Sequence, residues 1–505
     1  MADSAAGAAT ARGPDDGATR VPRSASLGPA LIVLTAVGIA YANAFAASFQ
    51  FDDWDVIVRD PRVQSLSAWW QSMPGIRPLL KLSYALHHAS GLGVVGFHAV
   101  NVAIHATNAL LVLTLVRALA ARGTAEPGSG ARADGIALAT ALVFALHPVQ
   151  TEAVTYASGR STSLSTGLAL ASLWLWVRAR DRGGSQLGSI ALMLLALGVK
   201  ESALGVPAAI ALWVASEPGR RERVRAAWRA ARAHALVLLV AVGASLALPA
   251  YRALAATSFA TRSPLENLVA QVDAIVYLAG QLVRFDRLNA DPALEAVTRL
   301  DPMRAIAAGT IAAIGLAALA GLARRPLAAF AVAWTFVWLA PTNSLVARLD
   351  LVNDRQLYAA LVGPALLLAL AIDALARRVR RPRWRAAVRL LLVAAIALGL
   401  GLATHRRNEV YRDELVFWQD VTRKSPRNAR AFNNLGFARA ERCELDAAAT
   451  AWRRALALDP TLVRAAVNLR LLEEGAGQAE RCRGTTGNPT RPAPPVSLGP
   501  RSPRP

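Results

Sequence analysis

The chain contains 505 residues, of which 54% are hydrophobic and only 6% aromatic. Apolar runs recur from residue 27 to residue 404 and then stop, which predicts an all-α polytopic membrane domain followed by a soluble appendix. The formal net charge of +22 does not indicate nucleic-acid binding, because the arginines fall in bursts between apolar runs, as the positive-inside rule explains. Two cysteines exclude a thiolate metal cluster within the chain and a disulfide-rich scaffold.

The first apolar run, residues 27–46, is long enough to cross a bilayer. Residues 1–26 are rich in Ala, Gly and Ser and end in several arginines, which predicts a disordered cytoplasmic tail. The alternative is a cleaved signal peptide, because residues 42–46 resemble signal-peptidase sites. The long polar leader and the many later spans favour the tail.

An acidic loop follows this first span, with the sequence FQFDDWDVIVRDPR over residues 49–62. Asp52 and Asp53 emerge where the helix should leave hydrocarbon, a costly place for carboxylates. We therefore expect one of them to be the catalytic base of a membrane enzyme. Asp55 and Asp60 are interpreted as solvated or helix-capping residues. Residues 65–89 are predicted to form amphipathic helices at the membrane interface.

The second span, residues 95–119, carries a polar stripe at spacings of three, four and three residues, which places its members on one helical face. The stripe consists of His98, Asn101, His105 and Asn108. Polar groups in lipid are expensive, so this face should point into the protein. Hydrogen bonding between helices is favoured over a metal site, because seven residues separate the histidines by about 10 Å along a helix.

The remaining spans are predicted from apolar runs and from arginine clusters that mark the inner side. Residues 265–288 are interrupted by polar side chains and are interpreted as interfacial or re-entrant. The pattern gives about eleven spans, a cytoplasmic amino terminus and an extracytoplasmic carboxy terminus. The predicted spans are residues 27–46, 95–119, 136–145, 164–177, 187–199, 203–215, 234–251, 303–322, 327–345, 356–376 and 388–404.

This topology places charged residues from distant parts of the chain on the outer side. They are Asp52, Asp53, Asp55, Arg77, Glu152, Arg160, Lys200, Glu201, Asp354 and Arg355. Carboxylates combined with several cations suit glycosyl transfer from a lipid phosphate, because the phosphate leaving group needs cationic stabilisation and the acceptor hydroxyl needs a base. For Lys200 and Glu201, which lie at the outer end of a tight hairpin, the alternative is that their side chains are simply solvated or extend to the membrane surface.

Residues 411–474 are predicted to form a short helical module in which residues 429–462 fit the 34-residue tetratricopeptide repeat, or TPR. The matching positions are Phe432, Leu435, Gly436, Ala448, Trp452, Ala455 and Pro460. So few repeats favour a small docking platform, with an acceptor protein as its partner. Residues 475–505 are expected to be disordered. Cys443 and Cys482 either pair in an oxidising compartment or remain two free thiols.

Six segments in order carry a resemblance to a known family: FDDWDVIVRDP, RPLLKLSYALHH, GFHAVNVAIHATNALL, HPVQTEAVTYASGRS, LGVKES and NDRQLYAALVG. Over residues 30–475 the chain resembles the transmembrane-and-TPR-containing O-mannosyltransferases and their bacterial relatives, within the GT-C superfamily. The resemblance implies an inverting transfer of a sugar, typically mannose, from a polyprenyl phosphate to a protein hydroxyl. The reaction would occur on the extracytoplasmic face of the cell (inner) membrane.

By position, Asp52 and Asp53 match the family's catalytic first-loop motif, and Glu152 matches its second acidic position. Lys200 and Arg355 match positions suited to the donor phosphate. Arg160 and Arg77 are further candidates for that phosphate, with the alternative of anchoring headgroups. The chain departs from the family pattern in its short TPR array and at Thr162, where related sequences often carry an acidic residue.

The resemblance implies no required cofactor. A divalent cation is an alternative, since carboxylates and His147 could bind one, but these residues show no specific ligand spacing. Two alternative functions follow from the same residues. One is a non-enzymatic membrane scaffold that presents the TPR module. The other is a transporter or ligase of lipid-linked glycans.

Overall fold

The computed structural model describes residues 27–122, 129–219, 222–476 and Cys482. Within these residues all regular secondary structure is helical and no strand occurs, which confirms the predicted all-α class. The predicted amino-terminal tail, residues 1–26, and most of the predicted carboxy-terminal tail lie outside the described residues.

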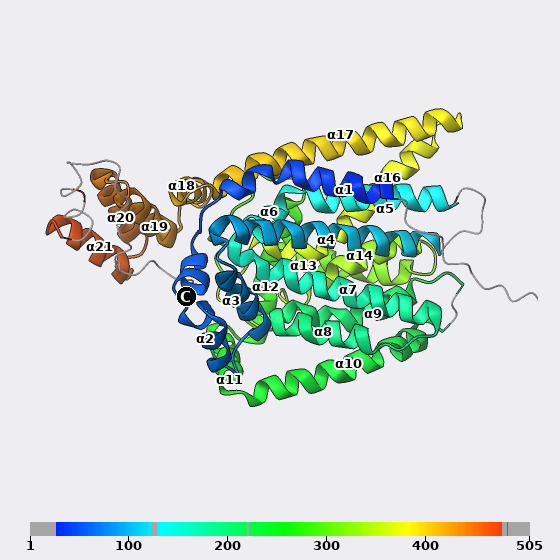
Figure 1. Ribbon diagram of the computed structural model, residues 1–505, viewed down its shortest axis with the longest axis horizontal. Coiled ribbons are helices and arrows are strands. Elements are labelled where there is room, and N and C mark those ends of the chain that lie inside the picture. Colours follow the sequence, from blue (N-terminus) through cyan, green and yellow to red (C-terminus); the bar gives the residue numbers. More distant parts are fainter. Residues whose placement is uncertain (1–26, 123–128, 220–221, 477–481, 483–505) are drawn as a thin grey trace, which may run out of the picture.

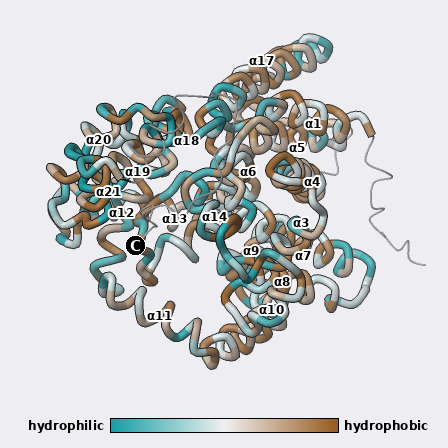
Figure 2. The backbone as a smooth tube through the Cα atoms, turned by 60° about the vertical axis from the view of Figure 1, so that its left-hand side comes forward, coloured by the Kyte–Doolittle hydropathy of each residue, from teal (hydrophilic) through white to brown (hydrophobic). Residues whose placement is uncertain are grey.

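A bundle of helices forms the body of the molecule, and four further helices project from one of its ends (Figure 1). Hydrophobic residues predominate along most helices of the bundle (Figure 2), and their buried side chains form one large core. The bundle helices are α1 (Leu27–Ala40), α2 (Leu66–Gln71), α3 (Pro78–Ser90), α4 (Gly93–Ala121), α5 (Ser129–Leu146), α6 (Thr151–Val154), α7 (Arg160–Arg182), α8 (Leu187–Val199), α9 (Val206–Ala215), α10 (Arg223–Ala247), α11 (Pro249–Thr261), α12 (Pro264–Gln281), α13 (Pro302–Gly321), α14 (Pro326–Leu339), α15 (Leu357–Ala360), α16 (Val362–Arg377) and α17 (Pro382–Asn408).

Four described helices are long and apolar enough to cross a membrane, namely α4, α10, α13 and α17. The number rises to six if each of two bent pairs is one span: α5 with the turn after it, and α15 with α16. Shorter apolar helices are Leu27–Ala40, Leu187–Val199, Glu201–Ala215 and Pro326–Leu339. Each of the eleven predicted segments overlaps a helix. Length and composition support four to six spans, so the number eleven stays a prediction.

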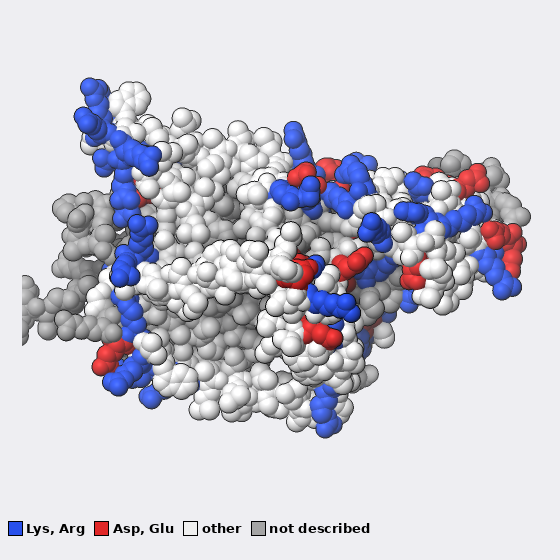
Figure 3. Space-filling model, turned by 180° about the vertical axis from the view of Figure 1, so that it is seen from behind, with Lys and Arg blue, Asp and Glu red and all other residues white. Residues whose placement is uncertain are grey.

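Charged residues gather at the two ends of the bundle, and few lie between them on the face shown in Figure 3. At the end away from the projecting helices, ion pairs join the arginine-rich helix ends. Arg122 lies 2.8 Å from Asp181, and Arg132 lies 2.8 Å from Asp373. The arginine clusters that the sequence assigns to the inner side therefore meet at one end of the molecule, as expected for a membrane protein.

The polar stripe on α4 is fully buried, and its side chains bond to other segments. His98 Nε2 lies 3.0 Å from the Ala47 carbonyl, and His105 Nε2 lies 2.9 Å from the Ala145 carbonyl. Asn101 and Asn108 donate to carbonyls of the segment around α6 and α7. The predicted role in hydrogen bonding between helices is confirmed, and the described residues contain no group of three or more metal-binding side chains.

The projecting helices are α18 (Glu414–Lys424), α19 (Ala429–Ala440), α20 (Leu445–Leu458) and α21 (Val463–Glu473). Trp452 is buried against α19, where a Cβ atom added to Gly436 would lie 2.6 Å from its Nε1 atom. Glycine at position 436 is therefore required by close packing. The paired helices agree with a TPR arrangement, but that assignment stays a prediction. Cys443 and Cys482 form a disulfide, which decides between the two alternatives left open for them.

Candidate active site

The acidic loop between α1 and α2 is held in place by Asp53. Its fully buried carboxylate accepts hydrogen bonds from two backbone N–H groups, those of Gln50 at 2.9 Å and Ser158 at 2.7 Å. Ser158 lies 105 residues away, so this side chain ties the loop to the segment between α6 and α7. Both carboxylate oxygens of Asp53 are therefore engaged by the protein itself.

Asp52 is only partly buried and differs from its neighbour in its surroundings. Its backbone N–H donates to the hydroxyl of Tyr156 at 2.9 Å. The preceding residue, Phe51, has a φ of +41°, in the left-handed region that a phenylalanine rarely adopts. Asp52 is partly exposed, whereas Asp53 is buried with both carboxylate oxygens bonded to the backbone, so the two carboxylates differ in their access to a substrate.

Glu152 and Arg355 form a buried pair beside this loop. The Glu152 carboxylate accepts the backbone N–H of Arg355 at 3.0 Å, and the guanidinium Nε lies 3.6 Å from its other oxygen. The Arg355 guanidinium also lies over the ring of Tyr156, 5.7 Å from its centroid. Tyr156 thus contacts the Asp52 backbone with its hydroxyl and Arg355 with its ring, and it joins the acidic loop to the buried pair.

Lys200 lies in the turn between α8 and the next helical turn, Glu201–Gly205. Its ammonium donates to the Thr162 hydroxyl at 2.6 Å. Burial lowers the pKa of Lys200, and the charges of Arg355 and Arg77 lower it further, whereas Glu201 opposes them. Thr162 is the position at which the chain departs from the family pattern, and its hydroxyl leaves the charge of Lys200 without the carboxylate that an acidic residue would supply.

Arg77 is drawn to the same region by an ion pair with Glu201, in which two hydrogen bonds of 3.0 and 2.7 Å join the side chains. Burial raises the pKa of Tyr84 in α3, and the charges of Arg160, Asp53, Arg77 and Arg355 all act on that pKa. Of these groups, the Arg160 guanidinium lies over the Tyr84 ring, 5.4 Å from its centroid. The structure brings together Asp52, Asp53, Glu152, Lys200, Arg355 and Arg77 at the end of the bundle that carries the projecting helices.

Arg160 is placed differently from the other predicted cations. Its Nε atom donates to Asn101 Oδ1 at 2.7 Å, and its terminal nitrogens donate to the carbonyls of Phe97 and Ser83. The guanidinium also lies over the Phe97 ring, 4.7 Å from its centroid. With its nitrogens engaged in this way and its side chain buried, Arg160 holds α3, α4 and α7 together.

Asp55 and Asp60 lie outside the cluster. Asp55 is exposed and pairs with Arg59 at 2.8 Å, and Asp60 caps the turn Pro61–Val63 by accepting the backbone N–H of Arg62. Both match the solvated and capping roles expected for them. Sequence reasoning missed Tyr156 and Ser158 as site residues, although both lie within HPVQTEAVTYASGRS, whose unusual density of polar residues at a span end was a usable signal.

Stability should fall as pH rises through the titration range of Asp53. Burial raises the pKa of its carboxyl from 3.8 to about 7, against the two backbone N–H groups that favour the charged form. The folded protein then keeps a proton that the unfolded chain releases, so folding loses stability between pH ~4 and ~7, by at most roughly 4 kcal/mol.

Asp53→Asn mimics the neutral carboxyl and removes this dependence. We expect the difference in melting temperature, variant minus native protein, to increase as the pH is raised from 4.5 to 7.5. A difference that stays constant over this window would contradict the assignment.

The fold and the site together describe a helical membrane protein with an acidic loop and buried cations at one end. The chain is 29% identical over 171 residues to protein O-mannosyl-transferase TMTC4 of Mus musculus, covering 30% of the chain and 23% of that protein. It is 29% identical over 241 residues to protein O-mannosyl-transferase F38B6.6 of Caenorhabditis elegans, covering 44% of the chain and 32% of that protein. The identity to TMTC1 of Mus musculus is 31% over 173 residues, covering 31% of the chain and 17% of that protein.

The chain therefore resembles the TMTC-type protein O-mannosyl-transferases, as the six segments indicated, and it spans less than a third of the length of these relatives. No family model matches the chain, and no solved structure matches it.

Proposed function

We propose that the chain is a glycosyltransferase of the GT-C type that moves a sugar, with mannose as the first candidate, from a polyprenyl phosphate to a protein hydroxyl. The observation that carries this proposal is the bridge made by Tyr156. It joins the backbone of Asp52 to the Arg355–Glu152 pair, so a partly exposed acidic residue is linked to a buried cation. A base for the acceptor and positive charge for the departing phosphate are the two requirements of this reaction.

In this proposal Asp52 is the base that takes the proton of the acceptor hydroxyl. Asp53, with both oxygens bonded to the backbone, positions the loop. Arg355, Lys200 and Arg77 bind the donor phosphate, and Glu152 orients Arg355. The sugar is transferred as the hydroxyl attacks its anomeric carbon, the bond to the phosphate breaks, and the phosphate leaves as an anion.

The reaction is assigned to the extracytoplasmic face of the membrane, with about eleven spans and a cytoplasmic amino terminus. Two observations support this orientation. Arginine-rich helix ends meet at the end away from the site, as on the cytoplasmic side of membrane proteins. The Cys443–Cys482 disulfide in the projecting module favours an oxidising compartment. The module itself, as a TPR platform, would dock the acceptor protein.

The test is an assay of the purified protein in lipid nanodiscs with a panel of polyprenyl monophosphate sugars and a hydroxyl-bearing acceptor protein. We expect transfer from at least one monosaccharide donor, in EDTA as well as in its absence, since no cofactor is assigned. Transfer of a long glycan from a pyrophosphate carrier would favour the ligase alternative. Absence of any transfer, with cellular function lost only on deletion of residues 411–474, would favour the scaffold.

A further inference from the structure

A cavity of about 1250 Å³ lies between the end of α12, the loop after it, the end of α17 and the start of α18. It is lined by seven basic side chains and only two carboxylates. The basic residues are Arg284, Arg287, Arg406, Arg407, Arg423, Lys424 and Arg427, and the acidic residues are Asp286 and Asp420. None of the cations proposed to bind the donor phosphate lines this cavity, so it is a separate concentration of positive charge.

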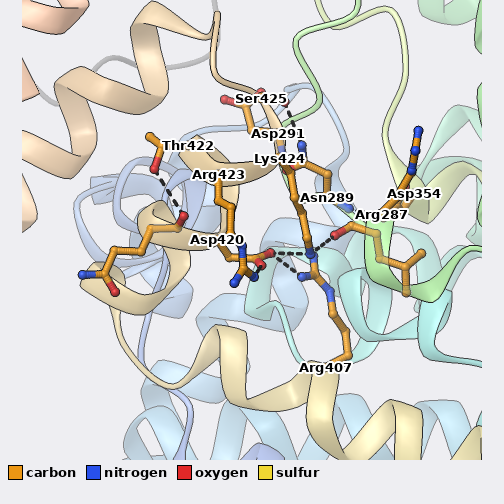
Figure 4. Close-up of polar contacts among 12 residues, drawn as sticks. Arg287, Asn289, Asp291, Asp354, Arg407, Asp420, Thr422, Arg423, Lys424 and Ser425 are labelled. Carbon is orange, nitrogen blue, oxygen red and sulfur yellow. Dashed lines mark hydrogen bonds and ion pairs between the residues drawn. The ribbon is translucent and has the colours of Figure 1, made fainter.

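Asp420 holds three of these cations in a fixed arrangement, which Figure 4 shows. Its carboxylate lies 2.6 Å from Arg407, 2.7 Å from Arg423 and 2.8 Å from Lys424. One carboxylate cannot neutralise three cations, so the wall keeps an excess of positive charge. Lys424 is further fixed by donating to the Leu288 carbonyl at 2.7 Å. The group is a pre-organised cationic surface, because its side chains are ordered before any ligand arrives.

The other basic residues add charge at the mouth of the cavity. Arg284, Arg406 and Arg427 are exposed and form no ion pair with a carboxylate of the described residues. Burial lowers the pKa of Lys424 to about 8, and the neighbouring Arg407 contributes. The positive charges of Lys424 and Arg407 repel each other. An anionic ligand would relieve this repulsion, because a negative charge nearby favours the protonated form of Lys424.

Apolar surface borders the cavity on the side of the bundle. The span formed by α17 reaches its end here, and Leu402 on that helix is exposed. Val276, which lines the opposite wall, and Val283, which directly precedes the lining residue Arg284, are also exposed. A ligand that suits this border has an anionic head, for the arginines, joined to an apolar tail, for the aliphatic side chains that face the membrane.

We propose that this cavity binds the phosphate headgroup of an anionic membrane lipid. The wall of the cavity adjoins the candidate active site, since the lining residues Tyr277, Gln281 and Asn289 all donate hydrogen bonds to Asp354, the neighbour of Arg355. Lipid binding does not depend on sugar transfer, so it is measurable without a donor.

The test compares binding of phosphatidic acid, phosphatidylcholine and soluble glycerol phosphate to the purified full chain by native mass spectrometry in detergent. The pocket variant carries Arg284→Gln, Arg406→Gln and Arg427→Gln. The control variant carries Arg324→Gln, Arg325→Gln and Arg380→Gln, three exposed arginines elsewhere. We expect the pocket variant to bind phosphatidic acid at least about tenfold more weakly, the scale of one lost charge-assisted hydrogen bond, and the control variant to bind it normally.

The proposal would be overturned if both variants lost affinity for phosphatidic acid equally. It would also be overturned if the pocket variant kept its affinity and its melting temperature. Glycerol phosphate that binds as tightly as the lipid would also overturn the lipid assignment and make a free phosphate the ligand. If the pocket variant unfolds, the triple substitution of the same arginines by Lys keeps the charge, and it must then retain binding.

Discussion

Replacing Asp52 by Asn is expected to slow sugar transfer by about 10²- to 10⁴-fold, the usual contribution of a general base. The affinity for the donor and the melting temperature should change little, because Asn keeps the size and polarity of Asp and the side chain of Asp52 is only partly buried. Its backbone contact with Tyr156 is independent of the side chain and survives the substitution. The measurement is kcat at saturating polyprenyl-phosphate sugar, together with thermal unfolding.

Asp55→Asn is the matched control, since Asp55 belongs to the same loop but is exposed and paired with Arg59. It should transfer sugar at close to the native rate. The assignment of the base to Asp52 fails if Asp52→Asn keeps the native rate while a folded Asp53→Asn protein loses it. Asp53 would then take the proton in spite of its two backbone hydrogen bonds.

Hydrophobic runs predicted the helices well, because a run of apolar residues long enough to span a bilayer has few alternatives to a helix. Each of the eleven predicted segments overlaps a helix, although the segment 327–345 runs six residues past the end of α14 at Leu339. The number of crossings is harder to derive from composition. The helix α7, for example, begins with Arg160 and a series of Ser and Thr residues that are buried inside the bundle, so its hydropathy understates how deep it lies.

Residue types predicted which charges gather at one end, but they could not predict what each charge contacts. Arg160 and Arg355 both emerged as candidates for the donor phosphate. Arg160 is enclosed by Asn101 and two carbonyls, whereas Arg355 lies beside Tyr156 and the acidic loop. That difference depends on packing between segments 59 to 203 residues apart, which no local sequence pattern records.

The contact between the acidic loop and the carboxy-terminal module also escaped prediction. The ring of Phe51 packs 5.0 Å from that of Trp418, and Trp54 Nε1 donates to Glu414 at 2.9 Å. Gln50 donates to the Tyr411 carbonyl at 3.0 Å. The start of the module therefore braces the loop that carries Asp52 and Asp53, in addition to any role in docking.

Lys200→Met is expected to raise the KM for the lipid donor by about 10- to 100-fold, the scale of a charge-assisted contact to phosphate. The same substitution should leave the protein as stable as the native form or more stable. The ammonium is buried and its hydrogen-bond partner is the neutral Thr162 hydroxyl, so its removal relieves a desolvation cost. Replacing a residue with a purely structural role would lower stability and activity together. For Lys200→Met we expect weaker donor binding without a lower melting temperature.

Arg355 is less suitable for this test, because its removal would leave Glu152 buried beside an empty position, and an unpaired buried charge is strongly destabilising. Arg59→Gln is the control for a general loss of positive charge near the site, since Arg59 is exposed on the acidic loop. It should keep the native KM. If the Lys200→Met protein binds the donor with the native KM, Arg355 and Arg77 must hold the phosphate without Lys200. The ammonium of Lys200, which faces the neutral Thr162 hydroxyl, would then have no part in donor recognition.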